Sequence, residues 1–169
     1  MWISLRAGDL IAEALNTPFN WLVPDVMLEE ELKDPPGAWL EKQGVKRCEL
    51  TGEQVRKVME LAERYIRPSR VDLFALVQAK EEGAILLTED QNLREAAEAE
   101  GLEVHGTLWM LDQMVKEKRI TPRQAAESLR KMLESGRRFP STEVERRLRL
   151  WSKSPTSISS PGERGGRTV

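Results

Sequence analysis

Four short apolar runs alternate with segments of helical period in the first two thirds of the chain. Each run is about as long as a buried strand of a parallel sheet, which is apolar on both faces. The segments between the runs carry apolar residues at helical spacing. This alternation predicts an α/β fold with three layers, α/β/α, around a central parallel sheet with right-handed crossovers. The predicted strands are 19–23, 45–50, 84–88 and 102–106, and the helices between them are 24–33, 51–66, 69–82 and 92–100.

The chain after residue 106 shows only helical patterns, up to Trp151. We therefore predict one domain, 1–151, whose last part, 107–151, consists of C-terminal helices. Residues 152–169 are rich in Ser, Pro and Gly with almost no apolar residues, which predicts a disordered tail. Polar residues mark several helix ends, with Ser69 as an N-cap, Gly83 as a C-cap, and capping boxes at Thr51–Gln54, Thr121–Gln124 and Thr142–Glu145.

Carboxylates follow the predicted strands at the edge where α/β sheets form their sites. Asp72 opens one helix, Asp90 ends a strand 18 positions later, and the run Glu29-Glu30-Glu31 follows strand 19–23. Ligands bind outside the carboxyl ends of parallel strands, so these acids are expected near one locus. Neighbouring helical positions are turned by about 100°, so any one of the three Glu residues can face the sheet end. Oxygen ligands of this kind suit Mg²⁺ or Mn²⁺.

The same residues have structural interpretations that the spacing leaves open. A run of Glu on a helix is usually a solvated face. An Asp in the first turn of a helix, such as Asp72, usually serves the helix dipole or a cap. A Thr-x-Asp after a strand, as at Thr88–Asp90, is often an N-cap. Spacing alone therefore does not decide for the metal site.

The stretch from Val71 to Leu93 resembles the core signature of PIN-domain ribonucleases. It contains an Asp that opens an Ala-bearing helix and an apolar strand that ends in Thr-x-Asp. VPDVMLEEEL resembles the second acidic motif of that family, and WISLRAGDLI resembles the end of its first strand and its first helix. GTLWMLDQMVKEKRITP resembles the segment after the last core strand in a subgroup related to toxin–antitoxin ribonucleases. The motifs are short, but they occur in the right order over residues 1–150.

The resemblance implies a divalent-metal-dependent endoribonuclease with Mg²⁺ or Mn²⁺ as its cofactor. By that resemblance, Asp72, Asp90 and Glu30 are the metal ligands and catalytic acids, with Glu29 as the alternative because the register is ambiguous by one. The accessory positions implied around them are Thr88, Asn92 and Thr107. The expected partners are an RNA substrate and, for a toxin of a toxin–antitoxin pair, an antitoxin protein.

One part of the family pattern is missing. The first metal-binding Asp of the family lies a few residues before the position matched by Trp2-Ile3, and Asp9 falls too late to replace it. We expect that a start site placed too late explains this. The alternative function is a catalytically impaired PIN-like module that binds RNA or a protein partner.

Charge and composition add little that competes with this interpretation. The net charge is −2, but residues 1–112 carry a balance of −10 and residues 113–151 one of +6, a layout that suits an acidic site with a basic flank. One Cys and one His exclude an internal disulfide and a His-based site, and no phosphate-binding loop is present. No run is long enough to span a membrane, so a cytoplasmic protein is expected. The apolar helices around 107–135 also suit a homodimer.

Overall fold

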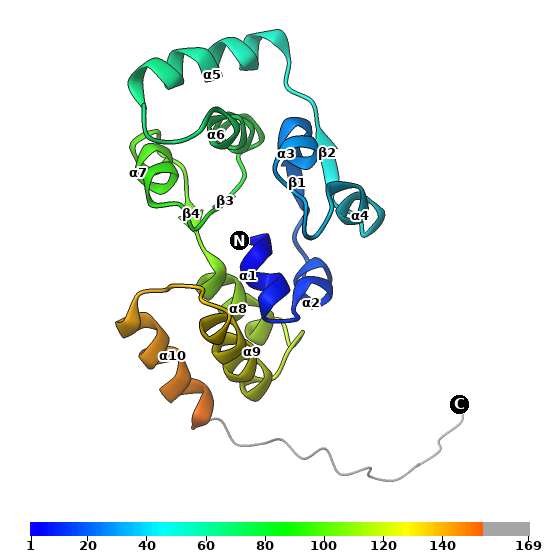
Figure 1. Ribbon diagram of the computed structural model, residues 1–169, viewed down its shortest axis with the longest axis vertical. Coiled ribbons are helices and arrows are strands. Elements are labelled where there is room, and N and C mark those ends of the chain that lie inside the picture. The colour runs from blue at the N-terminus through cyan, green and yellow to red at the C-terminus, as the bar shows by residue number, and fades with distance from the viewer. Residues whose placement is uncertain (154–169) are drawn as a thin grey trace, which may run out of the picture.

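The computed structural model describes residues 1–153 and shows two groups of elements joined around the N-terminus (Figure 1). One group holds the strands with the helices that connect them, and the other holds α1, α2 and the C-terminal helices. The elements in chain order are α1 (Trp2–Ala7), α2 (Ile11–Leu15), β1 (Leu22–Pro24), α3 (Asp25–Glu30), α4 (Gly37–Lys42), β2 (Lys46–Cys48), α5 (Gly52–Arg64), α6 (Arg70–Glu82), β3 (Leu86–Leu87), α7 (Gln91–Ala99), β4 (Val104–His105), α8 (Thr107–Lys116), α9 (Pro122–Glu134) and α10 (Ser141–Ser152).

The strands pair in parallel, as predicted, but they form two small sheets instead of one. Within residues 1–153, β1 pairs with β2 and β3 pairs with β4. Leu22 lies opposite Lys46 in the first sheet, and Leu86 lies opposite Val104 in the second. The predicted α/β class and the parallel pairing therefore agree with the structure, whereas a single central sheet is not found in residues 1–153 and the three-layer arrangement stays a prediction. The physical reason is that β1 and β3 do not touch, because a cavity separates them.

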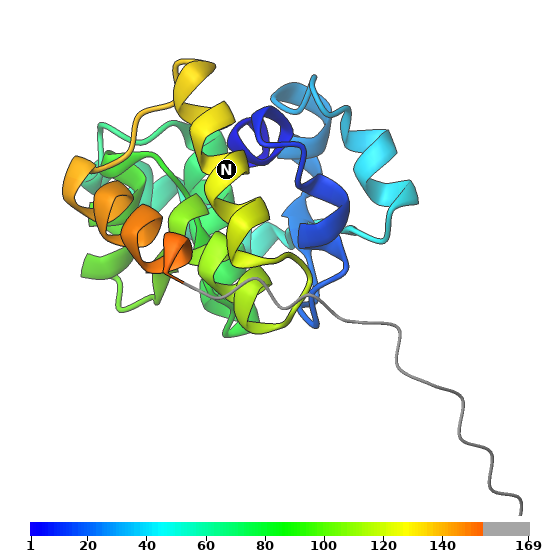
Figure 2. The ribbon, with the colours of Figure 1, turned by 90° about the horizontal axis from the view of Figure 1, so that it is seen from below.

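Two hydrophobic clusters hold the elements together. The smaller cluster packs α5, α6 and α7 against β3 and β4, around Leu73, Leu76 and Val77. The larger cluster joins α1, α2, β1 and the three C-terminal helices. Seen from below, α9 and α10 lie across this side of the molecule (Figure 2), and α1 packs against α9. The N-terminal residues therefore connect the C-terminal helices to the strands.

The first residues differ from the expectation for the end of a strand. Residues 2–7 form the short helix α1, whose Trp2, Ser4 and Leu5 are buried. The helix that the resemblance implies next begins at Ile11, as α2, after Asp9 adopts a left-handed conformation with φ 56°. The apolar pattern of this segment does not distinguish a strand from a buried helix because the run is short.

Most helix boundaries agree with the polar signals in the sequence. Capping boxes begin α5 at Thr51 and α9 at Thr121, and Gly83 ends α6 in the left-handed conformation. The capping box predicted at Thr142–Glu145 is wrong, because α10 starts at Ser141 after Pro140 and has no side-chain cap. The helix ends at Ser152, one residue beyond the predicted domain limit, and the rest of the predicted tail, 154–169, lies outside the described residues.

Helix α3, which carries Glu29 and Glu30 and ends just before Glu31, packs against α4. The close packing of these two helices depends on Gly37. Gly37 is buried at the start of α4, and a Cβ added there would collide with the backbone carbonyl of Leu28 in α3. We predict that Gly37→Ala lowers the free energy of unfolding by about 1–3 kcal/mol, the usual cost of overpacking. Urea denaturation measures this change.

The matched control is Gly52→Ala at the first position of α5. A Cβ at Gly52 meets nothing within 4 Å, so this variant should be neutral or more stable by up to about 1 kcal/mol. Equal losses for the two variants would contradict the close packing of α3 on α4.

Candidate functional site

A cavity of about 740 Å³ opens between β1 and β3. Its interior is mainly apolar and includes residues of both strands and of α6. Its charged lining residues are Arg6, Glu31, Lys33, Asp34 and Asp72. Among them, Arg6 forms an ion pair with Asp34, with 3.3 Å between Nε and Oδ1. The cavity therefore carries acids and bases at the strand ends, as the topology predicts.

Asp72 lies in the first turn of α6, where it also serves as a cap. Its Oδ2 atom accepts hydrogen bonds from the backbone N–H of Ser69 at 3.0 Å and from the Ser69 hydroxyl at 2.8 Å. The Ser69 hydroxyl in turn accepts the N–H of Asp72. The capping interpretation left open by the sequence thus holds for one carboxylate oxygen. Within residues 1–153, no hydrogen bond to the other oxygen, Oδ1, is found.

Of the three consecutive Glu residues, Glu31 is the one at the cavity. It follows the last residue of α3, and its side chain lines the cavity together with Asp72. Partial burial of the carboxyl group, and then the negative charges of Asp72 and Glu30, raise the pKa of Glu31. Glu29 points to another surface, where Arg47 Nη1 lies 2.6 Å from its Oε1. Glu30 is exposed and does not line the cavity.

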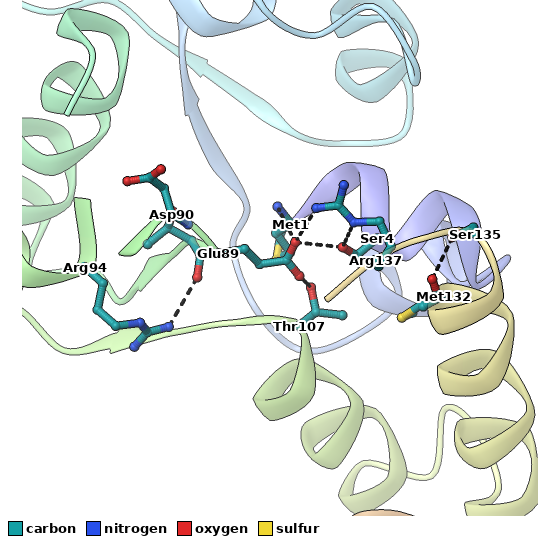
Figure 3. A network of polar contacts seen from close by, with 10 residues as sticks. Met1, Ser4, Glu89, Asp90, Arg94, Thr107, Met132, Ser135 and Arg137 are labelled. Atoms are coloured by element: carbon teal, nitrogen blue, oxygen red, sulfur yellow. Dashed lines mark hydrogen bonds and ion pairs between the residues drawn. The ribbon is translucent and has the colours of Figure 1, made fainter. Parts of the chain in front are cut away.

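Asp90 caps α7 and lies outside the cavity lining. Its Oδ1 accepts the N–H of Leu93 at 2.8 Å, and its carboxylate points away from the carboxylate of Glu89 (Figure 3). Thr88 is buried and lines the cavity, and its hydroxyl accepts the N–H of Asp90 at 3.1 Å. Asn92 is half-buried in the first turn of α7.

Of the acids that the resemblance implies, Asp72 lines the cavity, and the acid that joins it there is Glu31, which was not among them. Glu31 and Asp72 share the cavity, whereas Glu29, Glu30 and Asp90 do not line it. No group of three His, Cys, Asp or Glu residues that could hold a metal ion is found among residues 1–153. Mg²⁺ is commonly bound by one or two carboxylates and several waters, so the donor chemistry of the pair fits such an ion. The ligand set Asp72, Asp90 and Glu30 stays a prediction.

Directly after β3, the partly buried carboxylate of Glu89 gathers groups from three other parts of the chain (Figure 3). Glu89 Oε2 accepts the hydroxyl of Ser4 at 2.7 Å and the guanidinium of Arg137 at 3.0 Å. Its Oε1 accepts the hydroxyl of Thr107, and the amino group of Met1 lies 3.9 Å away. The Glu89 side chain is 18 % exposed. We call these five residues the Glu89 network.

The charge of Glu89 is stabilised by its partners. Burial alone would raise the pKa of its carboxyl group, but the Met1 amino group, the two hydroxyl donors and Arg137 together lower it. Burial also lowers the pKa of the Met1 amino group, which weakens that contact as a source of positive charge. The guanidinium of Arg137 lies closer to the carboxylate than the Met1 amino group does, at 3.0 Å against 3.9 Å. The network joins the α9–α10 connection to the end of β3.

Sequence reasoning did not identify this network. It selected Asp90 by its place after a strand, and it treated Arg137 only as part of the basic flank, residues 113–151. It had no signal that joins Glu89 to Arg137, which lies 48 positions away. Thr107 was expected beside a metal site and instead donates to Glu89.

Glu89→Gln tests the network through its pH dependence. A carboxyl group with a lowered pKa in the folded state adds stability that is complete above its unfolded pKa, about 4.3 for Glu, and is lost as pH falls through the folded pKa. We predict that Glu89→Gln lowers the free energy of unfolding by about 1–3 kcal/mol at pH 7. The difference from wild type should shrink below about pH 4.

Urea denaturation over a pH series measures this, with the exposed Glu60→Gln as the control. Glu60→Gln should match wild type at every pH. A Glu89→Gln deficit that persists undiminished at low pH would show that the carboxylate charge is not what stabilises the fold.

The comparisons with known proteins agree with this arrangement. A family model described as a PIN domain matches residues 3–153, which is 151 of the 169 residues. No curated protein and no solved structure gives a significant match. The match covers the parallel strands, the acids at their ends and the C-terminal helices. On this evidence, the chain belongs to the PIN-domain family.

Proposed function

We propose that this protein is a divalent-metal-dependent ribonuclease of PIN type whose site lies at the cavity between β1 and β3. The observation that carries the proposal is that Glu31 and Asp72 line the same cavity, where partial burial, and then the negative charges of Asp72 and Glu30, raise the pKa of Glu31. Two carboxylates in this relation repel each other unless a proton or a cation lies between them. PIN domains generally use divalent metals, and Mg²⁺ or Mn²⁺ suits these oxygen donors.

Different residues of the chain would bind the metal ion and the RNA phosphate at this site. Glu31 and the Oδ1 atom of Asp72 would hold the metal, while Ser69 fixes the orientation of Asp72 through Oδ2. A bound divalent ion supplies an activated water and stabilises the charge that develops on a phosphodiester during cleavage. Arg6 and Lys33 line the same cavity and provide positive charge for a phosphate of the RNA backbone.

The geometry favours Glu31 over Glu29 and Glu30 as the acid from α3. The ion pair with Arg47 holds Glu29 on a different surface, and Glu30 does not reach the cavity. Asp90 belongs to the same strand edge, and we keep it as a further proposed ligand. Its hydrogen bond to the N–H of Leu93 occupies Oδ1. Thr88, which lines the cavity beside it, is a proposed accessory residue.

The lack of a three-acid group in the described residues favours a second function, the impaired module that binds RNA or a protein. The basic flank, residues 113–151, offers such a module less positive charge for RNA phosphates than the sequence suggests, because some of its arginines form ion pairs within the chain. Arg137 is engaged with Glu89, and Arg147 with Asp112 and Glu143.

Within residues 1–153, no helix is long and apolar enough to cross a membrane. An antitoxin gene next to the gene for this chain would support the proposed toxin role.

Glu31→Gln and Asp72→Asn test the proposed site, with Glu29→Gln as the matched control. Both site variants keep side-chain hydrogen-bond acceptors, so the cap of α6 should survive Asp72→Asn. We predict that each weakens Mn²⁺ affinity by about tenfold or more, which corresponds to about 1.4 kcal/mol. Titration calorimetry measures the affinity, and cleavage of labelled RNA with Mg²⁺ or Mn²⁺ measures activity.

Glu29→Gln should leave both quantities unchanged because Glu29 lies on the Arg47 surface. A loss of metal affinity in Glu29→Gln with none in Glu31→Gln would show that the acid was assigned to the wrong residue. If wild type binds RNA but neither binds Mn²⁺ nor cleaves, and the double variant Asp72→Asn with Asp90→Asn binds RNA equally well, the binding module is the correct function.

A further inference from the structure

Three aromatic side chains form one connected stack beside the cavity. The imidazole of His105 lies parallel to the indole of Trp109, with 4.3 Å between the ring centroids and 3° between the ring planes. The ring of Phe19 packs on the same indole, tilted by 32° at a centroid distance of 5.7 Å. Aromatic pairs at such distances stabilise each other beyond the effect of their burial. The three rings therefore hold one another in place.

The stack leads from the cavity to the surface of the molecule. Phe19 and Trp109 line the cavity, whereas His105 does not. His105 ends β4 opposite Leu87, a cavity residue of β3, and its carbonyl accepts the N–H of Thr88 at 2.9 Å. Paired strands lie about 4.8 Å apart, so the backbone of His105 is one strand away from the cavity wall. The imidazole thus lies at the carboxyl ends of β3 and β4, next to the proposed site.

The imidazole of His105 is fixed in orientation and still partly exposed. Its side chain is 27 % exposed, and Trp109 is the only ring found stacked on it within residues 1–153. A parallel contact covers one face of a ring, so the opposite face can take a second ring. At the edge of the imidazole, Nε2 donates a hydrogen bond of 2.7 Å to Oε1 of Glu103. A ring held in this way loses little freedom when a ligand binds.

A flat π system is the ligand that suits such a ring. Proteins bind unpaired RNA bases by stacking them on His and other aromatic side chains. Stacking accepts any base, because every base has a π face. The exposed carboxylate of Glu103 lies beside the imidazole and repels a phosphate group. The base is therefore the part of an RNA strand that fits at this position.

We propose that the stack of Phe19, Trp109 and His105 is a platform that binds one unpaired base of a single-stranded RNA on the outer face of His105. The base adds a fourth ring and anchors the strand beside the cavity that Glu31 and Asp72 line. The proposal rests on the proposed function for the identity of the ligand as RNA. It goes further by naming single-stranded RNA as the substrate class and His105 as a residue that selects it.

RNA binding by the full chain in EDTA tests the platform without metal or cleavage. The probes are a single-stranded oligouridylate, the same strand paired with oligoadenylate, and inorganic polyphosphate, which has no bases. We expect wild type to prefer the single strand over the paired one. His105→Ala should weaken binding of the single strand by about tenfold, a typical loss for one stacked base, and leave binding of polyphosphate unchanged. His105→Phe should restore the wild-type affinity, because Phe keeps a ring.

Trp39→Ala is the matched control. Trp39 lies in α4 with 40 % of its surface exposed, and it does not line the cavity. This variant should bind the single strand as tightly as wild type. Equal losses in Trp39→Ala and His105→Ala would overturn the proposal. An equal loss of polyphosphate binding in His105→Ala, or no recovery in His105→Phe, would do the same.

A second measurement needs no substitution, and so it holds even if His105→Ala fails to fold. A 2-aminopurine base within the oligouridylate fluoresces, and stacking on an aromatic ring quenches this fluorescence. We expect wild type in EDTA to quench it at saturation. Uridine monophosphate should compete far more weakly than the oligomer, because it lacks the neighbouring phosphates. An absence of quenching, or equally strong competition by the free nucleotide, would contradict the proposal.

Failure of the platform and failure of the ribonuclease function give different results. A wild type that binds Mn²⁺ and cleaves RNA, but whose RNA affinity does not change in His105→Ala, refutes the platform alone. A wild type that neither binds Mn²⁺ nor cleaves, but quenches 2-aminopurine and loses affinity in His105→Ala, refutes the metal site and supports the platform.

Discussion

The partly buried carboxylate of Glu89 is the constraint on which the arrangement of the two halves depends. A charge in this position needs partners because burial without them is costly. Its partners come from α1, from the start of α8 and from the α9–α10 connection, through Ser4, Thr107 and Arg137. The end of β3 is thus tied to the C-terminal helices. These contacts hold β3, which forms one wall of the cavity, while β1 and α3 form the other wall.

On the facing wall, the ion pairs of two arginines engage acids near the cavity. Arg47 holds both Glu29 and Glu41, and so it keeps Glu29 away from Asp72. Arg6 pairs with Asp34 at the cavity itself. What remains at the cavity is the pair Glu31 and Asp72. Partial burial, and then the charges of Asp72 and Glu30, raise the pKa of Glu31 there. The same carboxylate of Asp72 caps α6, so helix stability and the proposed site share one residue.

Local signals predicted most of the helices, and long-range contacts decided what the sequence left open. The caps at Thr51, Thr121 and Gly83 depend on neighbouring residues and were predicted correctly. The choice within the Glu29–Glu31 run was not predictable, because it depends on Arg47, 18 positions from Glu29. The split into two sheets was missed for a similar reason. Strand pairing is non-local, and apolar runs of five residues do not reveal that only two or three of them pair.

The most direct test of the proposed site is the position of bound metal. Crystals of the wild-type protein grown with Mn²⁺ allow the ion to be located by its anomalous scattering. The account predicts a peak between the carboxylates of Glu31 and Asp72, at about 2.0–2.2 Å from the nearest oxygens, as for ions of this kind. A peak beside Glu29 or Glu89 instead, or no peak at saturating Mn²⁺, would contradict it.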